Sequence, residues 1–299
     1  MVPLFVVHRP ARTAARRLSV CALLAALVSA VPLQAGEISG FSPLAIEQVS
    51  ITRQLAMLRA ICDQGDVGIV DGLASCTVCP SYTSDADAAV SGLQIGNVIE
   101  GNFTRGNVPE VLVDLDGCEP HARLGGGAVI LERIGKGWRR VFYRAGFRPT
   151  QCIRFRTRDQ VQALACNIVD FSHGVQLGEL DWIELKDGVF HSTTLLSWLD
   201  NIQTNPAHLL SVFPYNFMTA DFNHDGRVDL RVKFRLRDER APQQYDGMID
   251  AIDAGYELSE PRTLQLLYLF DGMRLALAPE SAAAKQSIDA LLKTYQSGK

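Results

Sequence analysis

Apolar and polar residues alternate along much of this chain, which is the pattern of β-strands that bury one face. The clearest case begins at residue 228, where apolar residues occupy every second position and charged residues stand between them: Val228, Leu230, Val232, Phe234 and Leu236 against Asp229, Arg231, Lys233 and Arg235. Three further apolar runs are interrupted by short turns with Gly, at 137, 188 and 272. Because Gly accepts the positive φ of a tight turn, these runs predict hairpins and a mainly β protein.

Three stretches of the chain align without gaps and indicate a repeat. They are "NFTRGNVPEVLV" from 102, "RFRTRDQVQALA" from 154 and "DFNHDGRVDLRV" from 221, with Phe103, Phe155 and Phe222 in second place. Each stretch is a polar turn before a strand, and a hairpin follows later. We therefore expect four-stranded antiparallel units at about 95–148, 149–201 and 209–278, the third with an acidic insertion at 237–262. The three Phe rings should be buried at equivalent positions, each at the entrance to a strand.

The regions on either side of this β domain (95–278) differ from it. Apolar spacing predicts a helix from Pro43 to Cys62, capped by Ser42, and a C-terminal helix from Glu280 to about Tyr295. Residues 63–92 are rich in Gly, Asp and Ser, which is typical of a loop. The expected organisation is therefore a helix with a disulfide-tied loop segment over 36–94 and a terminal helix over 279–299.

Residues 1–35 have the order of a secretory signal peptide: arginines, an apolar run from Leu18 to Leu33, and small residues before the cleavage site. The run is shorter than the roughly 20 residues that span a bilayer, and no later segment is long and apolar enough. We therefore expect a periplasmic or secreted protein without a membrane span. Removing 4 of the 29 basic residues leaves 25 against 33 acidic ones. This acidic balance disfavours nucleic acid as a partner.

Six cysteines follow the predicted signal peptide, and an even number in an exported chain favours disulfides. Cys152 and Cys166 flank two short strands around Asp159, so a hairpin would set them opposite each other, with Cα atoms about 4.4 to 6.8 Å apart. Cys62, Cys76, Cys79 and Cys118 would pair among themselves in an order that the sequence leaves open. "CTVC" (76–79) has redox spacing, but the turn-forming run that follows it favours a structural disulfide over a redox site. Zinc is disfavoured because no nearby His has ligand spacing.

The segment from Asp221 to Asp229 has the strongest chemical pattern, D-x-N-x-D-G-x-x-D. Asp221, Asn223, Asp225 and Asp229 offer side-chain oxygens, Arg227 offers its carbonyl, and Gly226 allows the chain to turn back. Oxygen ligands on a flexible loop suit Ca²⁺. An EF-hand would need Glu where Val232 stands, and helices on both sides.

This loop followed by a strand resembles the calcium loop of FG-GAP repeats, found in integrin-α-type β-propellers and in VCBS-type secreted proteins. The resemblance is carried by Asp221, Phe222, Asn223, Asp225, Gly226, Asp229 and Leu230, with His224 in place of the usual Gly. It implies propeller-like blade units, in a complete or an incomplete ring, and a structural Ca²⁺ on Asp221, Asn223, Asp225, Arg227 and Asp229. Alternatives are an Asx-turn without metal and an ion with a direct functional role.

The matching positions of the other two units would not hold a dication. The first has Asn102, Thr104, Gly106 and Glu110, and the second has Arg154, Arg156, Arg158 and Gln162. No catalytic motif stands out. We therefore expect a non-enzymatic binding or scaffold module for a protein or glycan ligand. The alternative is a secreted metal-dependent hydrolase, with a site near insertion 237–262 or the loops that carry His121 and His173.

Overall fold

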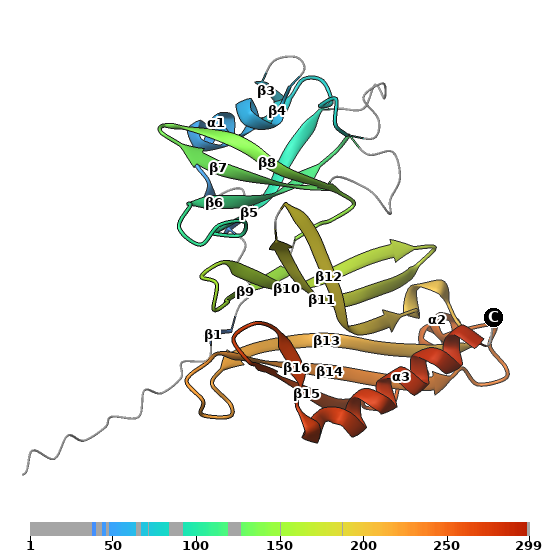
Figure 1. The fold of residues 1–299 in the computed structure, drawn as a ribbon. Coiled ribbons are helices and arrows are strands. Elements are labelled where there is room, and N and C mark those ends of the chain that lie inside the picture. Colours follow the sequence, from blue (N-terminus) through green and yellow to red (C-terminus); the bar gives the residue numbers. More distant parts are fainter. Residues whose placement is uncertain are drawn as a thin grey trace, which may run out of the picture. The chain divides into compact units, whose positions relative to one another are not determined.

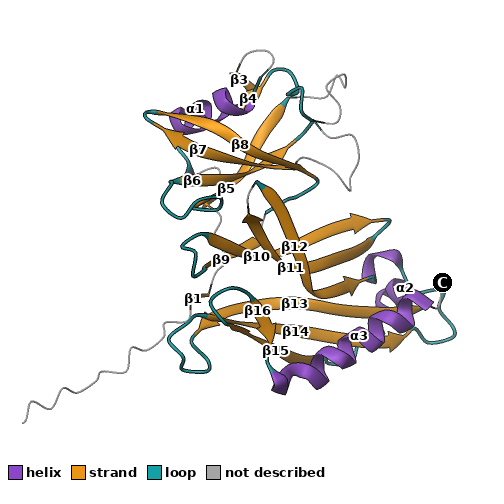
Figure 2. Cartoon of the chain, viewed as in Figure 1, coloured by secondary structure: helices purple, strands orange, loops and turns teal. Residues whose placement is uncertain are grey.

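The computed structural model describes residues 38–39, 44–45, 48–63, 67–70, 72–83, 92–118, 127–149, 151–186 and 188–297. The predicted signal peptide and His121 lie outside these residues. As expected, the described chain is mainly β: strands of two antiparallel sheets account for most of it, with few helices (Figure 1; Figure 2).

The first sheet has consecutive strands as neighbours, in the order β3-β4-β5-β6-β7-β8. Its strands are β3 (Val67–Val70), β4 (Leu73–Cys76), β5 (Leu93–Gly101), β6 (Glu110–Asp116), β7 (Gly127–Ile134) and β8 (Gly137–Ala145), and β2 (Leu44–Ala45) pairs with β5. The β7–β8 turn takes its positive φ at Gly135 rather than at Gly137, which begins β8.

The second sheet also follows the chain, from β9 at one edge to β16 at the other. Its strands are β9 (Gln151–Arg156), β10 (Gln162–Ser172), β11 (Val175–Lys186), β12 (Val189–Asp200), β13 (His208–Ala220), β14 (Asp229–Arg240), β15 (Arg262–Phe270) and β16 (Leu275–Leu277). β1 (Ile38–Ser39) pairs with the end of β13. The predicted alternation is seen in β14, where Leu230, Val232, Phe234 and Leu236 are buried, whereas Val228 precedes the strand and is exposed.

The predicted units contain β5–β8, β9–β12 and β13–β16, but the second and third are not separate blades. Leu199 and Asp200 of β12 pair with Val212 and Ser211 of β13, which joins both units in one sheet. No propeller blade is seen in the described part of the chain. The expectation of separate blades is wrong here because strand pairing continues from one unit into the next.

Helices lie at both flanks and in the insertion. α1 (Ile51–Ile61) is shorter than predicted: Ser50 caps it by accepting from Arg53 N at 3.4 Å, and Leu44–Ala45 is strand rather than helix. The C-terminal helix α3 (Ala282–Ser297) confirms the prediction and follows the 3₁₀ turn η3 (Pro279–Ser281). The turn η2 (Ile202–Thr204) precedes β13, and α2 (Met248–Asp253) lies in the acidic insertion.

The buried apolar residues form three clusters, one on each sheet and a third that contains residues of both. In the second sheet, side chains of β9–β12 such as Trp182 and Trp198 pack with Phe234 of β14 and with Ile288 and Leu292 of α3. In the first sheet, the buried face packs against Met57, Leu58 and Ile61 of α1. The aromatic residues Phe155, Trp182 and Phe270 contact one another, with ring centroids 5.4 to 5.8 Å apart. They anchor the end of the second sheet at which the 221–229 loop begins.

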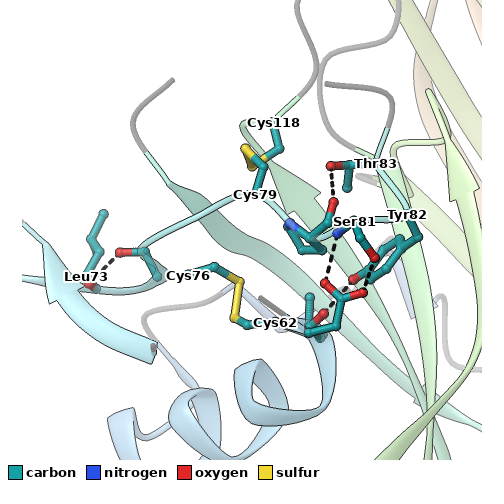
Figure 3. Close-up of a disulfide and its surroundings, with 12 residues drawn as sticks. Cys62, Leu73, Cys76, Cys79, Ser81, Tyr82, Thr83 and Cys118 are labelled. Carbon is teal, nitrogen blue, oxygen red and sulfur yellow. Dashed lines mark hydrogen bonds between the residues drawn. A yellow bond between two sulfur atoms is a disulfide. The ribbon is translucent and has the colours of Figure 1, made fainter. Parts of the chain in front are cut away.

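Three disulfides link the six cysteines. Cys152 and Cys166 are paired as predicted; they stand opposite each other on β9 and β10, and their Cα separation of 4.1 Å is slightly below the expected range. Figure 3 shows the other two, Cys62–Cys76 and Cys79–Cys118. The two cysteines of "CTVC" thus have different partners, which contradicts a Cys-x-x-Cys redox pair.

Hydrogen bonds beside these disulfides hold the chain between α1 and the first sheet. Asp63 accepts from Ser81 N at 2.8 Å and Ser81 Oγ at 2.5 Å, and Tyr82 Oη donates to Ile61 O at 2.9 Å (Figure 3). This part of the predicted loop segment also contains the β3–β4 hairpin, and β4 pairs with β5. The segment before residue 95 therefore adds strands to the first sheet.

Candidate functional site

The predicted calcium loop connects β13 to β14 and is bent by two residues with positive φ. Gly226 has φ of 85°, as its place in the motif suggests. His224, which stands where the FG-GAP pattern has Gly, has φ of 60°. The left-handed region costs energy for a residue with a Cβ. His224 therefore adopts this backbone at some cost, which a Gly at the same position would avoid.

Two of the predicted ligands converge on one backbone group. Asp221 Oδ1 and Asn223 Oδ1 both accept from Asp225 N, at 3.0 and 3.1 Å. Asp221 Oδ2 also accepts from Gly226 N at 2.8 Å. The first half of the loop thus has the geometry of an Asx-turn in which two side-chain oxygens face the same backbone N–H group.

The Asp225 carboxylate pairs with Arg227. It accepts from Arg227 N at 2.9 Å and from Arg227 Nη1 at 2.9 Å. Desolvation opposes ionisation of Asp225, but hydrogen bonds from Arg227 N and Asn223 and the Arg227 guanidinium outweigh it, and the pKa of Asp225 is lowered. Asp225 is therefore ionised at neutral pH and has a positive partner within its own loop.

Asp229 is the most constrained of the predicted ligands, because its side chain is fully buried. One carboxylate oxygen accepts from Phe222 N at 3.0 Å, and the other accepts from Phe270 N at 2.9 Å. Asp229 therefore ties the start of the loop to β15. It does not close a cage with the other side chains.

The five predicted ligands are thus in one loop: Asp221 and Asn223 converge on Asp225 N, whereas the Asp229 carboxylate is bound to Phe222 N and Phe270 N. In the residues that the structure describes, no three His, Cys, Asp or Glu side chains are grouped closely enough to hold a metal. The donor set still suits calcium, since it consists of oxygens alone. Ligation by Asp225 would require its carboxylate to leave Arg227.

The first predicted unit also has a buried acid, a similarity that the sequence interpretation missed. Glu110 aligns with Asp229 and is also buried. It accepts from Phe103 N at 2.5 Å and Thr104 N at 2.8 Å, as well as from Thr104 Oγ1. An acid at the first residue of the returning strand therefore binds the start of its own loop in both units. The sequence signal was present: an acidic residue at the same aligned place in two of three units.

The second unit replaces this acid by Gln162, whose Oε1 accepts from Asn102 N at 3.2 Å. Its loop is also shorter, because β9 continues to Arg156. As a result Phe155 lies inside a strand, whereas Phe103 and Phe222 follow the ends of theirs. Phe103 and Phe155 are buried, but Phe222 is only half-buried, with the Arg231 guanidinium 3.7 Å from its ring centroid. The expected equivalence of the three rings is therefore wrong.

The acidic insertion is held by its own polar groups. Glu239 accepts from Tyr256 Oη at 2.5 Å and from Ser259 N at 3.1 Å and Ser259 Oγ at 2.7 Å. At its base, His208 Nε2 lies 2.5 Å from Asp238 Oδ1. His173 lies elsewhere, in the β10–β11 turn, with φ of 51°.

A cavity of about 700 Å³ opens beside the 221–229 loop. The loop contributes Gly226, Arg227 and Val228, and β9 with its turn contributes Arg154, Arg156 and Arg158. Arg158 joins this turn to the β15–β16 turn, since Arg158 N donates to Gly272 O at 2.9 Å and Arg158 Nη2 donates to Asp271 O at 2.7 Å. The arginines of the second unit thus lie next to the candidate cation loop of the third.

In comparisons with protein-family models, curated proteins and solved structures, the chain matches none. No helix among the described residues is long and apolar enough to cross a membrane.

Proposed function

We propose that this protein is an exported, non-enzymatic binding or scaffold module in which Ca²⁺ stabilises the 221–229 loop. The observation that carries the proposal is the convergence of Asp221 Oδ1 and Asn223 Oδ1 on Asp225 N, within a loop whose side-chain donors are oxygens. Three disulfides loosely support an oxidising, extracytoplasmic location.

In the proposed calcium form, Asp221, Asn223 and Asp225 supply side-chain oxygens and Arg227 supplies its carbonyl. Asp225 would exchange its pairing with Arg227 for the ion. Asp229 would act mainly through the backbone groups that it already binds, because turning it outward would leave Phe222 N and the buried Phe270 N without an acceptor. The ion would therefore have a structural role, holding the 221–229 loop together, and we call it the calcium staple.

We also propose that the strand–loop–strand segments are repeats of one FG-GAP-like unit. β5 ends at Gly101 and β6 begins at Glu110, while β13 ends at Ala220 and β14 begins at Asp229, so the two loops have the same length. The shared buried acid supports the same relation.

Thermal unfolding with calcium and with a chelator tests the proposal. Binding to the folded state alone adds RT ln(1 + [L]/Kd), about 2.7 kcal/mol at a hundredfold excess over Kd. Calcium should therefore raise the melting temperature of the wild type. Asp225→Ala should abolish this rise and leave the fold intact by circular dichroism.

Asn102→Ala is the matched control, because Asn102 aligns with Asp221 but its loop has no comparable set of carboxylates. Asn102 Nδ2 donates to Gly106 O at 2.9 Å, so the variant will lower stability somewhat while its response to calcium stays as in the wild type. A wild-type melting curve that is the same in calcium and in chelator would contradict the staple and leave an Asx-turn without metal.

A further inference from the structure

The cavity beside the 221–229 loop has an unusual charge. Four arginines line it, Arg154, Arg156, Arg158 and Arg227, and no Asp or Glu is among its described lining residues. The chain after the predicted signal peptide has 25 basic and 33 acidic residues. Four positive side chains therefore meet at one cavity of a chain whose overall balance is acidic. A concave site lined by one sign of charge focuses the field on an oppositely charged ligand.

Two of these guanidinium groups lie close to each other. The Nε atoms of Arg158 and Arg227 are 2.8 and 3.4 Å from the position that a Cβ at Gly272 would take. Gly272 has φ of 94° in the β15–β16 turn and lacks that atom. Both side chains thus share the space over this glycine, although like charges at short range repel each other.

The protein neutralises only part of this charge. Arg154 Nη1 donates to Glu100 O and Arg158 Nη2 donates to Asp271 O, and both acceptors are neutral backbone carbonyls. Within the described residues, Arg156 has no hydrogen bond or ion pair through its side chain, and only Arg227 of the four is in a salt bridge, with Asp225 at 2.9 Å. A further carboxylate, Asp271, accepts from Arg274 N at 2.9 Å and Met273 N at 2.7 Å in its own turn, which lowers its pKa, and the charge of Arg158 helps to lower it.

We propose that this cavity is a binding site for a small ligand or glycan segment that carries closely spaced anionic groups, such as two phosphates, sulfates or carboxylates. Guanidinium groups bind such oxyanions with paired hydrogen bonds, and several arginines around one cavity favour a ligand with more than one charge. The volume of about 700 Å³ is that of a small-molecule pocket. Ile153, Phe155 and Phe270 add an apolar wall against which the uncharged part of the ligand would pack.

This inference names the ligand class of the binding role proposed above, but it does not depend on calcium. Titration calorimetry in calcium-free buffer of low ionic strength tests it, with pyrophosphate, sulfate, malonate and chloride as probes. We expect saturable one-to-one binding of pyrophosphate, weaker binding of the single-group sulfate and no binding of chloride. Malonate shows whether paired carboxylates substitute for phosphates. Added NaCl should weaken binding because it screens the charges.

Arginine variants locate the site. Because a hydrogen bond to a charged group contributes about 1.5 to 3 kcal/mol, Arg158→Gln should weaken pyrophosphate binding about tenfold or more. Arg156→Gln, which removes no described hydrogen bond, should weaken binding as well without any structural loss. Arg235→Gln is the matched control: it removes the same charge from β14, where Arg235 lies 4.8 Å from the Tyr215 ring centroid, outside the cavity.

Melting curves of each variant show that it is folded before affinities are compared. The proposal is overturned if pyrophosphate gives no saturable binding to the wild type. It is equally overturned if folded Arg156→Gln and Arg158→Gln bind as well as the wild type, or if Arg235→Gln loses as much affinity as they do. If the protein binds pyrophosphate but its melting temperature does not respond to calcium, the anion site is supported and the structural calcium site is rejected.

Discussion

The buried carboxylate of Asp229 should be the most important polar group of the candidate loop for stability. Asp229→Ala removes the acceptor of Phe222 N at 3.0 Å and of Phe270 N at 2.9 Å, and the second of these bonds is fully buried. A hydrogen bond to a charged group contributes about 1.5 to 3 kcal/mol, and a buried N–H without an acceptor adds a desolvation penalty. We therefore expect the free energy of unfolding to fall by about 3 to 5 kcal/mol. Urea unfolding in chelator, extrapolated linearly to water, measures this change without any contribution from calcium.

Asp221→Ala is the control, since Asp221 accepts from Asp225 N and Gly226 N in the exposed part of the same loop. Loss of such a turn-capping group costs about 1 kcal/mol. Asp229→Asn keeps one oxygen acceptor and should lie between the two alanine variants. If Asp229→Ala costs no more than Asp221→Ala, Asp229 does not anchor the loop as inferred from its burial.

Three further predictions follow from other contacts. Replacing Cys152 and Cys166 by Ala removes a disulfide with a sequence separation of 14 and should lower the free energy of unfolding by about 3 kcal/mol. Non-reducing urea titrations measure this change, and an unchanged midpoint would contradict the prediction. Partial burial would raise the pKa of Glu239, but hydrogen bonds within the insertion outweigh this effect and lower the pKa. The Glu239 carboxylate therefore stabilises the fold above its unfolded-state pKa of about 4.5, and this stability is lost as pH falls through the lowered pKa. Glu239→Gln should flatten this acid dependence in unfolding titrations, and a parallel pH profile would count against it. Asp225 pairs with Arg227, so calcium that binds Asp225 should free the Arg227 guanidinium for an anion. In calorimetry, calcium should therefore raise the affinity for sulfate in the wild type but not in Asp225→Ala. Equal affinities with and without calcium would mean that the two sites are uncoupled.

The sequence alone determined the features that depend on neighbours along the chain. Alternation from Leu230 to Leu236 predicted β14, because side chains on a strand point to opposite faces in turn. The Cys152–Cys166 disulfide followed from the hairpin between them, and the D-x-N-x-D-G pattern identified a turn with Gly226 at positive φ. Each of these features is specified within one strand, hairpin or loop.

The tertiary structure decided what distant segments do to one another. Pairing of β12 with β13 merged two predicted units, because a free strand edge is satisfied by whichever strand packs beside it. Burial turned Asp229 toward Phe270 N, a partner 41 residues away that no local motif identifies. The arginine cavity likewise exists only because the β9–β10 turn, the 221–229 loop and the β15–β16 turn meet in space. Local patterns specify strands and turns, whereas the direction of a polar side chain depends on which backbone groups the fold leaves without a partner.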